Sequence, residues 1–464
     1  MRRGCGWLQA GLVALAGLGL APAALRAQDT IERLVADVER DGTRVGLVAL
    51  DAGGRILARH RATELFVPAS NQKLLTAAAA LEELGTGHEF VTRFALAKGE
   101  LVVAAGGDPN WISGSDHDPA RVLGVVLAAL RANGVGAVRG VRVEPGPFTG
   151  PARPDGWPTD QLDRTYAAPT GAVALDAGCV RVRVTPTRTG PAQVEIVHPP
   201  AAVPIDGSIQ AVPKGRRTPV FHVRDTGGVL RVSGQVQAGT RGIEASVAVA
   251  DAEAWFRTAA ADALRSAGIA LADAAPQTDL ALAEYRSPVW PAVEAALKDS
   301  SNFHAEMLLR SIGAKHGDGS FAGGIKAVQA ALRTLLGGWP EGAVLADGSG
   351  LSRDNRITPG MLAILLRRAA ERGYAERFRN ALAVAGADGT LERRFHGSPV
   401  QGRVFAKTGY LRGVSALSGY VLQDDGRPRT FVILMNAGPN ARVAALRKAQ
   451  ERIVEAIAAA PAEK

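Results

Sequence analysis

The residue pattern that indicates secondary structure changes twice along the chain, and this change constrains the fold more than any other feature. Residues 28–95 and 283–464 contain helical patterns rich in Ala and Leu, whereas residues 96–282 contain short β-prone runs separated by many Gly and Pro residues. A chain of 464 residues, 47% of them hydrophobic, has enough material for two or three packed domains. We therefore predict a multidomain α+β protein in which both ends of the chain form one domain and a long, mainly β insertion interrupts it.

Turn residues, capping residues and apolar periodicity locate the individual elements. The turn at Gly53 and Gly54 predicts a hairpin, and in the insertion Asp118, Pro119 and Gly134 predict one well-capped helix. The expected elements are strands at 45–50, 56–59, 414–422 and 430–435, and helices at 31–38, 70–84, 119–133 and 443–457. The last of these helices carries an apolar stripe, which we expect to pack onto a sheet.

The first 27 residues are expected to be an export signal. Arg2 and Arg3 precede an apolar stretch from Leu12 to Leu20, and small residues around Ala21 and Ala27 offer cleavage positions. The apolar stretch has about ten residues, well below the ~20 that cross a bilayer, so we expect a cleaved signal rather than a transmembrane anchor. The mature protein would be exported, periplasmic or otherwise outside the cytoplasm, and soluble. Its formal charge would fall from +9 to about +6, a surplus too small to indicate a polyanionic partner.

Three short motifs with hydroxyl, amine and amide groups occur in order along the chain. They are S-x-x-K at Ser70 and Lys73, S-x-N at Ser300 and Asn302, and K-T-G at residues 407–409. Only nine of the 54 basic residues are lysines, so about 0.3 S-x-x-K matches and about 0.05 K-T-G matches are expected by chance. S-x-N alone is uninformative because Ser is common. The ordered set of three, however, strongly indicates a shared site.

The first motif pairs a nucleophile with a base. Ser70 is predicted to stand at the start of a helix, with Lys73 about one turn later on the same face. A serine hydroxyl is a weak nucleophile unless a neighbouring base takes its proton, and lysine is such a base only when burial or nearby positive charge lowers its pKa. The helix N-terminus adds partial positive charge and free N–H groups where an acyl oxyanion would form. We therefore expect Ser70 to be the nucleophile and Lys73 its general base.

The other two motifs are suited to holding a substrate. Lys407 follows an apolar run, as expected of an edge strand, and Gly409 lets a substrate backbone approach closely. The Lys407 ammonium can bind a carboxylate and, by like-charge repulsion, keep Lys73 deprotonated. Ser300 and Asn302 lie in a predicted break between two helices, where a hydroxyl can relay a proton and an amide can hold the substrate. Helix capping is the alternative explanation of this second motif.

These motifs resemble those of the penicillin-binding proteins and serine β-lactamases. The 230 residues that separate Ser70 from Ser300 far exceed the spacing in β-lactamases. A long insertion at this point is similar to the class C low-molecular-mass penicillin-binding proteins, the D-alanyl-D-alanine carboxypeptidase/endopeptidase family. Further segments that resemble this family are residues 106–109, 166–169, 347–353 and 388–391. The resemblance covers nearly all of the chain after the signal, and it implies a penicillin-binding/β-lactamase-like domain whose antiparallel sheet is flanked by helices.

The resemblance also implies roles for the matched positions. Ser70 would be acylated, with Lys73 as its base and Ser300 as the third catalytic residue. Lys407 and Thr408 would bind the terminal carboxylate of the substrate. The full set of implied substrate-binding residues is Asn302, Lys407, Thr408, Gly409 and Tyr410.

Two positions depart from the family pattern. Ser301 stands where the family often has Asp or Asn, and Tyr410 stands where a smaller residue is common. Tyr410 would contribute its backbone N–H, together with that of Ser70, to an oxyanion hole. We therefore expect catalysis to survive this departure and the leaving-group preference to change.

The ligands that the resemblance implies are peptidoglycan peptides and β-lactams. It implies no cofactor, no metal ion, no nucleic acid and no transmembrane anchor, and weak peripheral contact with a membrane is compatible with the sequence.

Other hydrolase mechanisms find less support. No serine lies in a G-x-S-x-G elbow and the eight histidines are scattered, which disfavours a Ser-His-Asp hydrolase. The sequence has no H-E-x-x-H motif, which disfavours a metallopeptidase. Asp347 and Asp388 both precede Gly and are interpreted as turn residues rather than carboxylate catalysts. Two alternatives keep the fold, namely a serine β-lactamase and a non-catalytic wall-binding protein.

Overall fold

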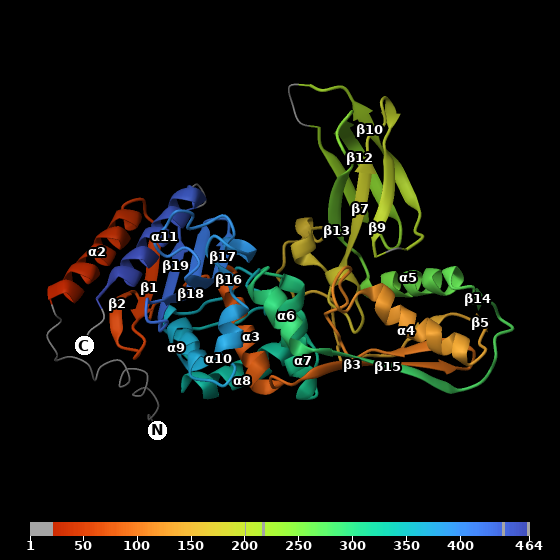
Figure 1. Ribbon diagram of the computed structural model, residues 1–464, viewed down its shortest axis with the longest axis horizontal. Coiled ribbons are helices and arrows are strands. Elements are labelled where there is room, and N and C mark those ends of the chain that lie inside the picture. Colours follow the sequence, from red (N-terminus) through yellow and green to blue (C-terminus); the bar gives the residue numbers. More distant parts are fainter. Residues whose placement is uncertain (1–21, 200, 216–218, 439–440, 462–464) are drawn as a thin grey trace. The chain divides into compact units, whose positions relative to one another are not determined.

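The computed structural model describes residues 22–199, 201–215, 219–438 and 441–461 (Figure 1). The chain forms two compact units. The first contains the residues up to Thr86 together with 293–301 and 322–464, and the second contains residues 87–292 and 302–321. Most of the predicted export signal lies outside the described residues. Pro22 begins helix α2 (Pro22–Glu39), which is longer than the predicted helix at 31–38.

An antiparallel sheet, six-stranded over the described residues, forms the centre of the first unit. Its strand order is β16-β17-β18-β19-β1-β2, so the N-terminal hairpin lies beside the C-terminal strands. The bounds of these strands are β1 Arg44–Leu50, β2 Ile56–His60, β16 Ala383–Val384, β17 Val404–Leu411, β18 Val414–Leu422 and β19 Pro428–Asn436. The predicted hairpin, the predicted C-terminal strands and the antiparallel sheet flanked by helices are confirmed.

Helices cover both faces of this sheet (Figure 1). On one face lie α2 and α11 (Val443–Ala459), and the apolar stripe of α11 is buried through Leu446, Ile453 and Ile457, as predicted. On the other face, the Tyr420 hydroxyl of β18 donates to the carbonyl of Leu366 in α9 (Pro359–Ala370). The other helical segments wholly or partly in this unit are η1 Ala69–Asn71, α3 Gln72–Glu83, α6 Val289–Leu297, α8 Phe321–Leu336, α10 Ala375–Asn380 and η5 Gly389–Leu391.

The second unit combines small sheets with helices. Strands β3 (Glu89–Ala97) and β15 (Leu280–Pro288) pair antiparallel, so the segment 87–292 enters and leaves this unit along neighbouring strands. The remaining strands are β4 Glu100–Ala104, β5 Ala137–Val138, β6 Val141–Val143, β7 Cys179–Thr185, β8 Gly190–Pro191, β9 Gln193–His198, β10 Ile205–Val212, β11 Phe221–Asp225, β12 Leu230–Gln237, β13 Ile243–Ala248 and β14 Ala270–Leu271. The helical segments are α4 Pro119–Ala132, η2 Thr159–Gln161, η3 Thr165–Ala167, η4 Asp176–Gly178, α5 Ala252–Ser266 and α7 Asn302–Lys315.

The capping signals in this unit behave as the sequence predicts at α4. The Asp118 carboxylate accepts a hydrogen bond from the N–H of Ala120, and Gly134 follows the helix with φ 67°. Helix α5 is absent from the sequence prediction, although Asp251 caps it in the same way by accepting hydrogen bonds from two backbone N–H groups. The insertion is therefore more helical than its Gly- and Pro-rich texture indicates.

The division into units differs at its edges from the expected boundaries at 95 and 283. Residues 87–95 and 283–292 belong to the second unit because β3 and β15 pair with each other. Helix α7 belongs there as well, since Phe303 and Met307 are buried in the hydrophobic core of that unit. The sequence pattern marks a change in secondary structure, whereas the units are defined by tertiary contacts.

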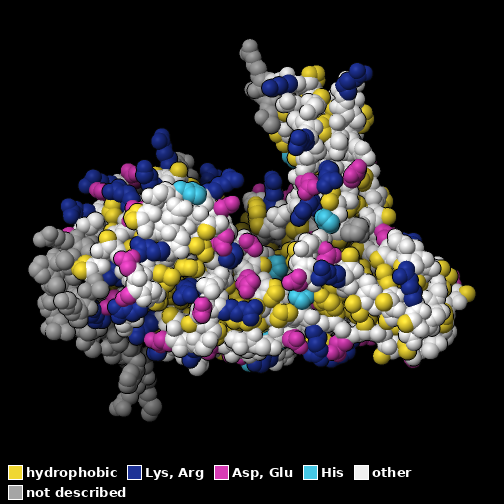
Figure 2. Space-filling view, viewed as in Figure 1, with side chains coloured by type: hydrophobic (Ala, Val, Ile, Leu, Met, Phe, Trp, Pro, Cys, Tyr) yellow, Lys and Arg dark blue, Asp and Glu magenta, His cyan; other side chains and the backbone are white. Residues whose placement is uncertain are grey.

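The surface carries charges of both signs. Basic and acidic side chains are interspersed over the visible face (Figure 2). No helix within the described ranges is both long enough and apolar enough to pass through a lipid bilayer.

Candidate active site

Ser70 lies in the short 3₁₀ turn η1, directly before helix α3. The preceding residue, Ala69, is buried and has a positive φ of 47°, a conformation that is uncommon for a residue with a Cβ atom. Close packing accompanies this backbone conformation. A Cβ atom on Gly350 would lie only 1.9 Å from the Ala69 carbonyl oxygen, so only glycine fits there.

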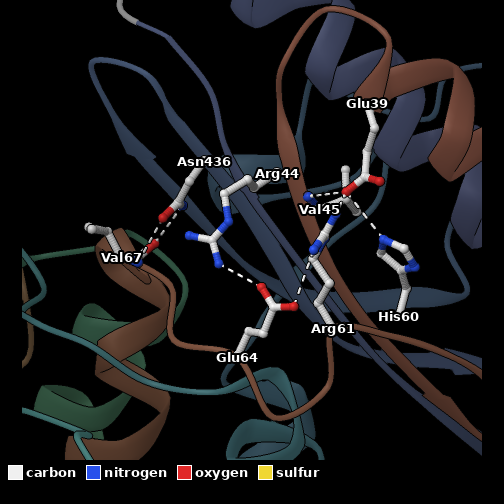
Figure 3. Close-up of polar contacts among 8 residues, drawn as sticks. All are labelled: Glu39, Arg44, Val45, His60, Arg61, Glu64, Val67 and Asn436. Carbon is white, nitrogen blue, oxygen red and sulfur yellow. Dashed lines mark hydrogen bonds and ion pairs between the residues drawn. The ribbon is translucent and has the colours of Figure 1, made fainter.

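The segment that leads to Ser70 is clamped to the sheet. The Asn436 side chain at the end of β19 accepts a hydrogen bond from the N–H of Val67 (2.9 Å) and donates one to its carbonyl (3.0 Å), as Figure 3 shows. Nearby, Glu64 accepts hydrogen bonds from Arg44 (2.8 Å) and Arg61 (3.2 Å). These contacts fix the chain between β2 and η1 without using any residue of the three motifs.

Lys73 lies beside Ser70, as the i, i+3 spacing predicts. Its Nζ atom is 3.0 Å from Ser70 Oγ and 2.7 Å from the carbonyl oxygen of Ser349, and the side chain is fully buried. An amine at this distance from a hydroxyl can accept its proton when the amine is neutral. The geometry therefore matches that of a nucleophile with its general base.

The carbonyl of Ser349 comes from a loop that the sequence analysis interprets only as a turn. Its buried Asp347 carboxylate accepts hydrogen bonds from the N–H groups of Gly350 (2.7 Å) and Ser352 (2.6 Å) and from the Asn355 side chain (2.8 Å). Asp347 is thus a turn residue, as predicted. By closing the loop it presents the Ser349 carbonyl to Lys73. The resemblance of segment 347–353 to a known family was the signal that could have indicated this role.

Strand β17 carries the third motif next to η1. The Asn71 side chain donates to the Lys407 carbonyl (2.9 Å) and accepts from the Ser418 hydroxyl (2.6 Å). A Cβ atom on Gly409 would lie 2.9 Å from the carbonyl oxygen of Pro68, so this glycine permits the close approach of the strand to the turn. The sequence analysis missed Asn71, which is buried within the first motif and joins it to the third.

Lys407 is a second fully buried amine in this region. Burial, and next the positive charge of Lys73, hold the pKa of Lys407 well below its usual range, while Asp299 acts in the opposite direction. Its Nζ atom lies 3.1 Å from the carbonyl oxygen of Thr408. The charge of Lys73 thus acts on Lys407, and the reverse effect, by which Lys407 keeps Lys73 deprotonated, stays a prediction.

The far part of β17 is an open edge. β16 pairs only with Phe405 and Ala406, so from Lys407 onward this side of β17 has no strand partner within the described chain. Tyr410 is 52% exposed, and the guanidinium of Arg447 in α11 lies 5.8 Å from the centre of its ring. The Tyr410 ring thus lies beside α11, and alternation along the strand points it to the side opposite to Lys407.

Ser300 lies in the break between α6 and α7, as predicted, whereas Asn302 already belongs to the helix. Ser300 is partly buried and has a φ of 62°. Asn302 begins α7 and is assigned to the second unit, where its side-chain amide donates to the carbonyl of Tyr166 (2.8 Å). The structure thus brings together Ser70, Lys73 and the strand of Lys407, whereas the roles of Ser300 and Asn302 remain predictions from the motif.

Two further observations concern histidine-dependent and metal-dependent mechanisms. The histidine of α7, His304, is buried, and burial lowers its pKa to about 4, so it is neutral at pH 7. Within the described residues, no three His, Cys, Asp or Glu side chains are grouped so that they could hold a metal ion.

Comparison with known proteins agrees with this geometry. The family model described as D-Ala-D-Ala carboxypeptidase 3 (S13) matches residues 27–459. A D-alanyl-D-alanine carboxypeptidase of Actinomadura sp. is 33% identical over 452 residues, which covers 89% of this chain and 81% of that protein. The D-alanyl-D-alanine carboxypeptidase DacB of Haemophilus influenzae is 27% identical over 423 residues, which covers 85% of this chain and 86% of that protein.

Solved structures share the fold. The crystal structure of penicillin binding protein 4 (dacB) from Haemophilus influenzae superimposes with a TM-score of 0.75 at 24% sequence identity, covering 90% of this chain and 98% of that one. The same protein complexed with a novel β-lactam superimposes with a TM-score of 0.71 at 23% identity, covering 91% and 99%. The penicillin-binding type of fold predicted from the motifs is thereby confirmed.

Proposed function

Because the chain belongs to the D-Ala-D-Ala carboxypeptidase 3 (S13) family, we propose that it hydrolyses D-alanyl-D-alanine bonds of peptidoglycan peptides through an acyl-enzyme on Ser70. The proposal includes both removal of a terminal D-alanine and cleavage of cross-links whose acyl donor is D-alanine. The observation that carries it is the 3.0 Å contact between Lys73 Nζ and Ser70 Oγ, made by a fully buried lysine beside a turn that precedes a helix.

The first half of the reaction forms the acyl-enzyme. Neutral Lys73 takes the proton of the Ser70 hydroxyl while Oγ attacks the carbonyl carbon of the penultimate D-alanine. The carbonyl oxygen becomes negative in the tetrahedral intermediate, and the backbone N–H groups of Ser70 and Tyr410 are the proposed donors that stabilise it. When the C–N bond breaks, the leaving amine must gain a proton. We assign its delivery to Lys73 through the Ser300 hydroxyl, on the strength of the second motif.

The second half of the reaction restores the enzyme. A water molecule gives a proton to the neutral amine of Lys73 and attacks the ester carbonyl. The ester bond to Ser70 Oγ then breaks as that oxygen regains a proton. The products are the shortened peptide and free Ser70.

Substrate binding is proposed along the open edge of β17. Lys407 and Thr408 would hold the carboxylate of the leaving residue, and the backbone at Gly409 would lie against the peptide. Asn302 would hold an amide of the substrate, an assignment that rests on the second motif. β-Lactams would acylate the same serine. Peptidoglycan lies outside the cytoplasm, so an exported, periplasmic protein fits this activity, and the export signal at residues 1–27 remains a prediction.

Mass spectrometry of the intact protein tests the proposal. After incubation with penicillin, the wild-type chain should gain one penicilloyl group on Ser70, and a D-Ala-D-Ala peptide should be shortened by one residue. Ser70→Ala should lose both reactions with a nearly unchanged melting temperature, because the hydroxyl is partly exposed and its side-chain contact within the described part of the chain is the one with Lys73. Labelling of the Ser70→Ala protein would refute the assignment of the nucleophile.

A further inference from the structure

Thr390 lies next to the proposed carboxylate-binding strand, although it belongs to none of the three motifs. In the structure the Thr408 hydroxyl donates to the hydroxyl oxygen of Thr390 (2.9 Å). Both side chains lie in the first unit, and Thr390 is exposed. An exposed threonine that contacts a substrate-binding residue can influence binding without being part of the hydrophobic core.

Several contacts of the protein backbone hold Thr390 in place. It is the central residue of the turn η5, and its N–H donates to the carbonyl of Lys298 (3.2 Å). At the start of the turn, the Asp388 carboxylate accepts from the N–H of Val384 (2.7 Å) and pairs with the ammonium of Lys298 (2.6 Å). Gly389 has a φ of 53°, and a Cβ atom there would lie 2.8 Å from the Lys298 carbonyl oxygen. The turn is therefore anchored from both sides, so the Thr390 hydroxyl is held beside Thr408.

The count of hydroxyl protons gives this contact a direction. Each threonine hydroxyl has one proton to donate and can accept hydrogen bonds from others. A carboxylate can only accept, so when Thr408 donates to a bound carboxylate, its hydrogen bond with Thr390 must reverse, and Thr390 becomes the donor. Without Thr390, the Thr408 hydroxyl would be free to rotate toward other acceptors.

We propose that Thr390 is a positioning residue that donates to Thr408 and thereby orients the Thr408 hydroxyl toward the carboxylate of the substrate. This inference rests on the proposed function of the same site. Its consequence is selectivity, because a hydrogen bond to an anionic oxygen is stronger than one to a neutral amide oxygen: Thr390 favours substrates whose leaving residue carries a free carboxylate over the same substrates with an amide at that position. A neutral hydrogen bond of this kind corresponds to a factor of about 3–10 in affinity.

Two peptides and two variants test the proposal. The peptides are a D-Ala-D-Ala peptide with a free terminal carboxylate and the same peptide with that carboxylate amidated, and the readout is kcat/KM for each. Thr390→Val keeps the shape of the side chain and removes the hydroxyl. It should lower kcat/KM about 3–10-fold for the carboxylate peptide, mainly through KM, and less than about 2-fold for the amide. Thr390→Ser keeps the hydroxyl and should retain the selectivity of the wild type.

Asp388→Ala provides an independent variant, because it leaves both hydroxyls in place and loosens the turn that holds Thr390. It should reduce the selectivity for the carboxylate peptide in the same direction. Equal losses on both peptides in Thr390→Val, or no loss on the carboxylate peptide, would overturn the role of Thr390 while leaving the proposed function intact. A wild-type protein that cleaves neither peptide and gains no penicilloyl group would overturn the proposed function, and this inference with it.

Discussion

Asn71→Ala is the substitution that tests most directly how the site is assembled. Asn71 belongs to η1 and is fully buried. Its side chain donates to the Lys407 carbonyl and accepts from the Ser418 hydroxyl, so it joins η1 to the two neighbouring strands β17 and β18. Removing it leaves two buried polar groups without this partner. At about 1–3 kcal/mol for each group, the folded state should lose roughly 2–6 kcal/mol of stability.

The loss should be visible in both melting and catalysis. For a unit of this size, roughly 2–4 °C of melting temperature is expected per kcal/mol, so Asn71→Ala should melt at least about 4 °C below the wild type. Because the lost contacts join the turn of Ser70 to the strand of Lys407, the rate of penicillin acylation should fall by at least about 10-fold. The rate is to be measured by mass spectrometry at a temperature where both proteins are folded.

Asn110→Ala provides the matched control. Asn110 is also a buried asparagine whose amide makes two hydrogen bonds, to the Ser287 hydroxyl and to the Pro288 carbonyl, but it belongs to the second unit. It should lower the melting temperature by a similar amount and leave the acylation rate within about 2-fold of the wild type. If Asn71→Ala acylates as fast as Asn110→Ala, the proposed coupling between turn and strand is wrong.

The remaining predictions concern the two lysines and the fate of the acyl-enzyme. Lys73→Arg should abolish acylation, because arginine keeps its charge and cannot accept the serine proton. Lys407→Arg should mainly raise KM for a carboxylate peptide, because it keeps the positive charge that binds the carboxylate. Equal losses of acylation rate in the two variants would contradict this division of roles. The pKa of Lys407 is lowered, so its ammonium is lost as pH rises through a range below that of an ordinary lysine, and KM for the carboxylate peptide should rise there while KM for its amide does not. At pH values just below the range in which Lys407 loses its proton, both its ammonium and the substrate carboxylate are charged. The increase in KM for the carboxylate peptide is therefore expected only when the pH is raised. The penicilloyl ester on Ser70 should persist far longer than the peptidyl ester, because the leaving group of penicillin stays tethered beside the ester. Rapid-quench mass spectrometry compares the lifetimes of the two esters. Equally fast turnover of penicillin and peptide would place the protein with the β-lactamases.

Local sequence patterns predicted those parts of the structure that depend on neighbouring residues. Lys73 lies beside Ser70 because a helical turn brings residues three apart onto one face, and the strand of Lys407 follows from a short apolar run. The hairpin at Gly53 and the cap at Asp118 are equally local. Helix α5 was missed because its Ala-rich pattern lies in a region whose Gly and Pro content indicated strands.

The relations that could not be predicted depend on backbone groups brought together by tertiary packing. The Ser349 carbonyl that contacts Lys73 could belong to any residue type, because every residue has a carbonyl. The side chains that position such backbone groups, however, can be identified in the sequence. Gly350 permits contact with Ala69, Asp347 closes its loop, and Asn71 joins the turn to β17. A motif of reactive side chains therefore identifies the chemistry, whereas the small and amide residues around it determine whether the reactive atoms meet. Substitutions at these supporting positions should consequently impair acylation even though none of their side chains is assigned a part in the reaction.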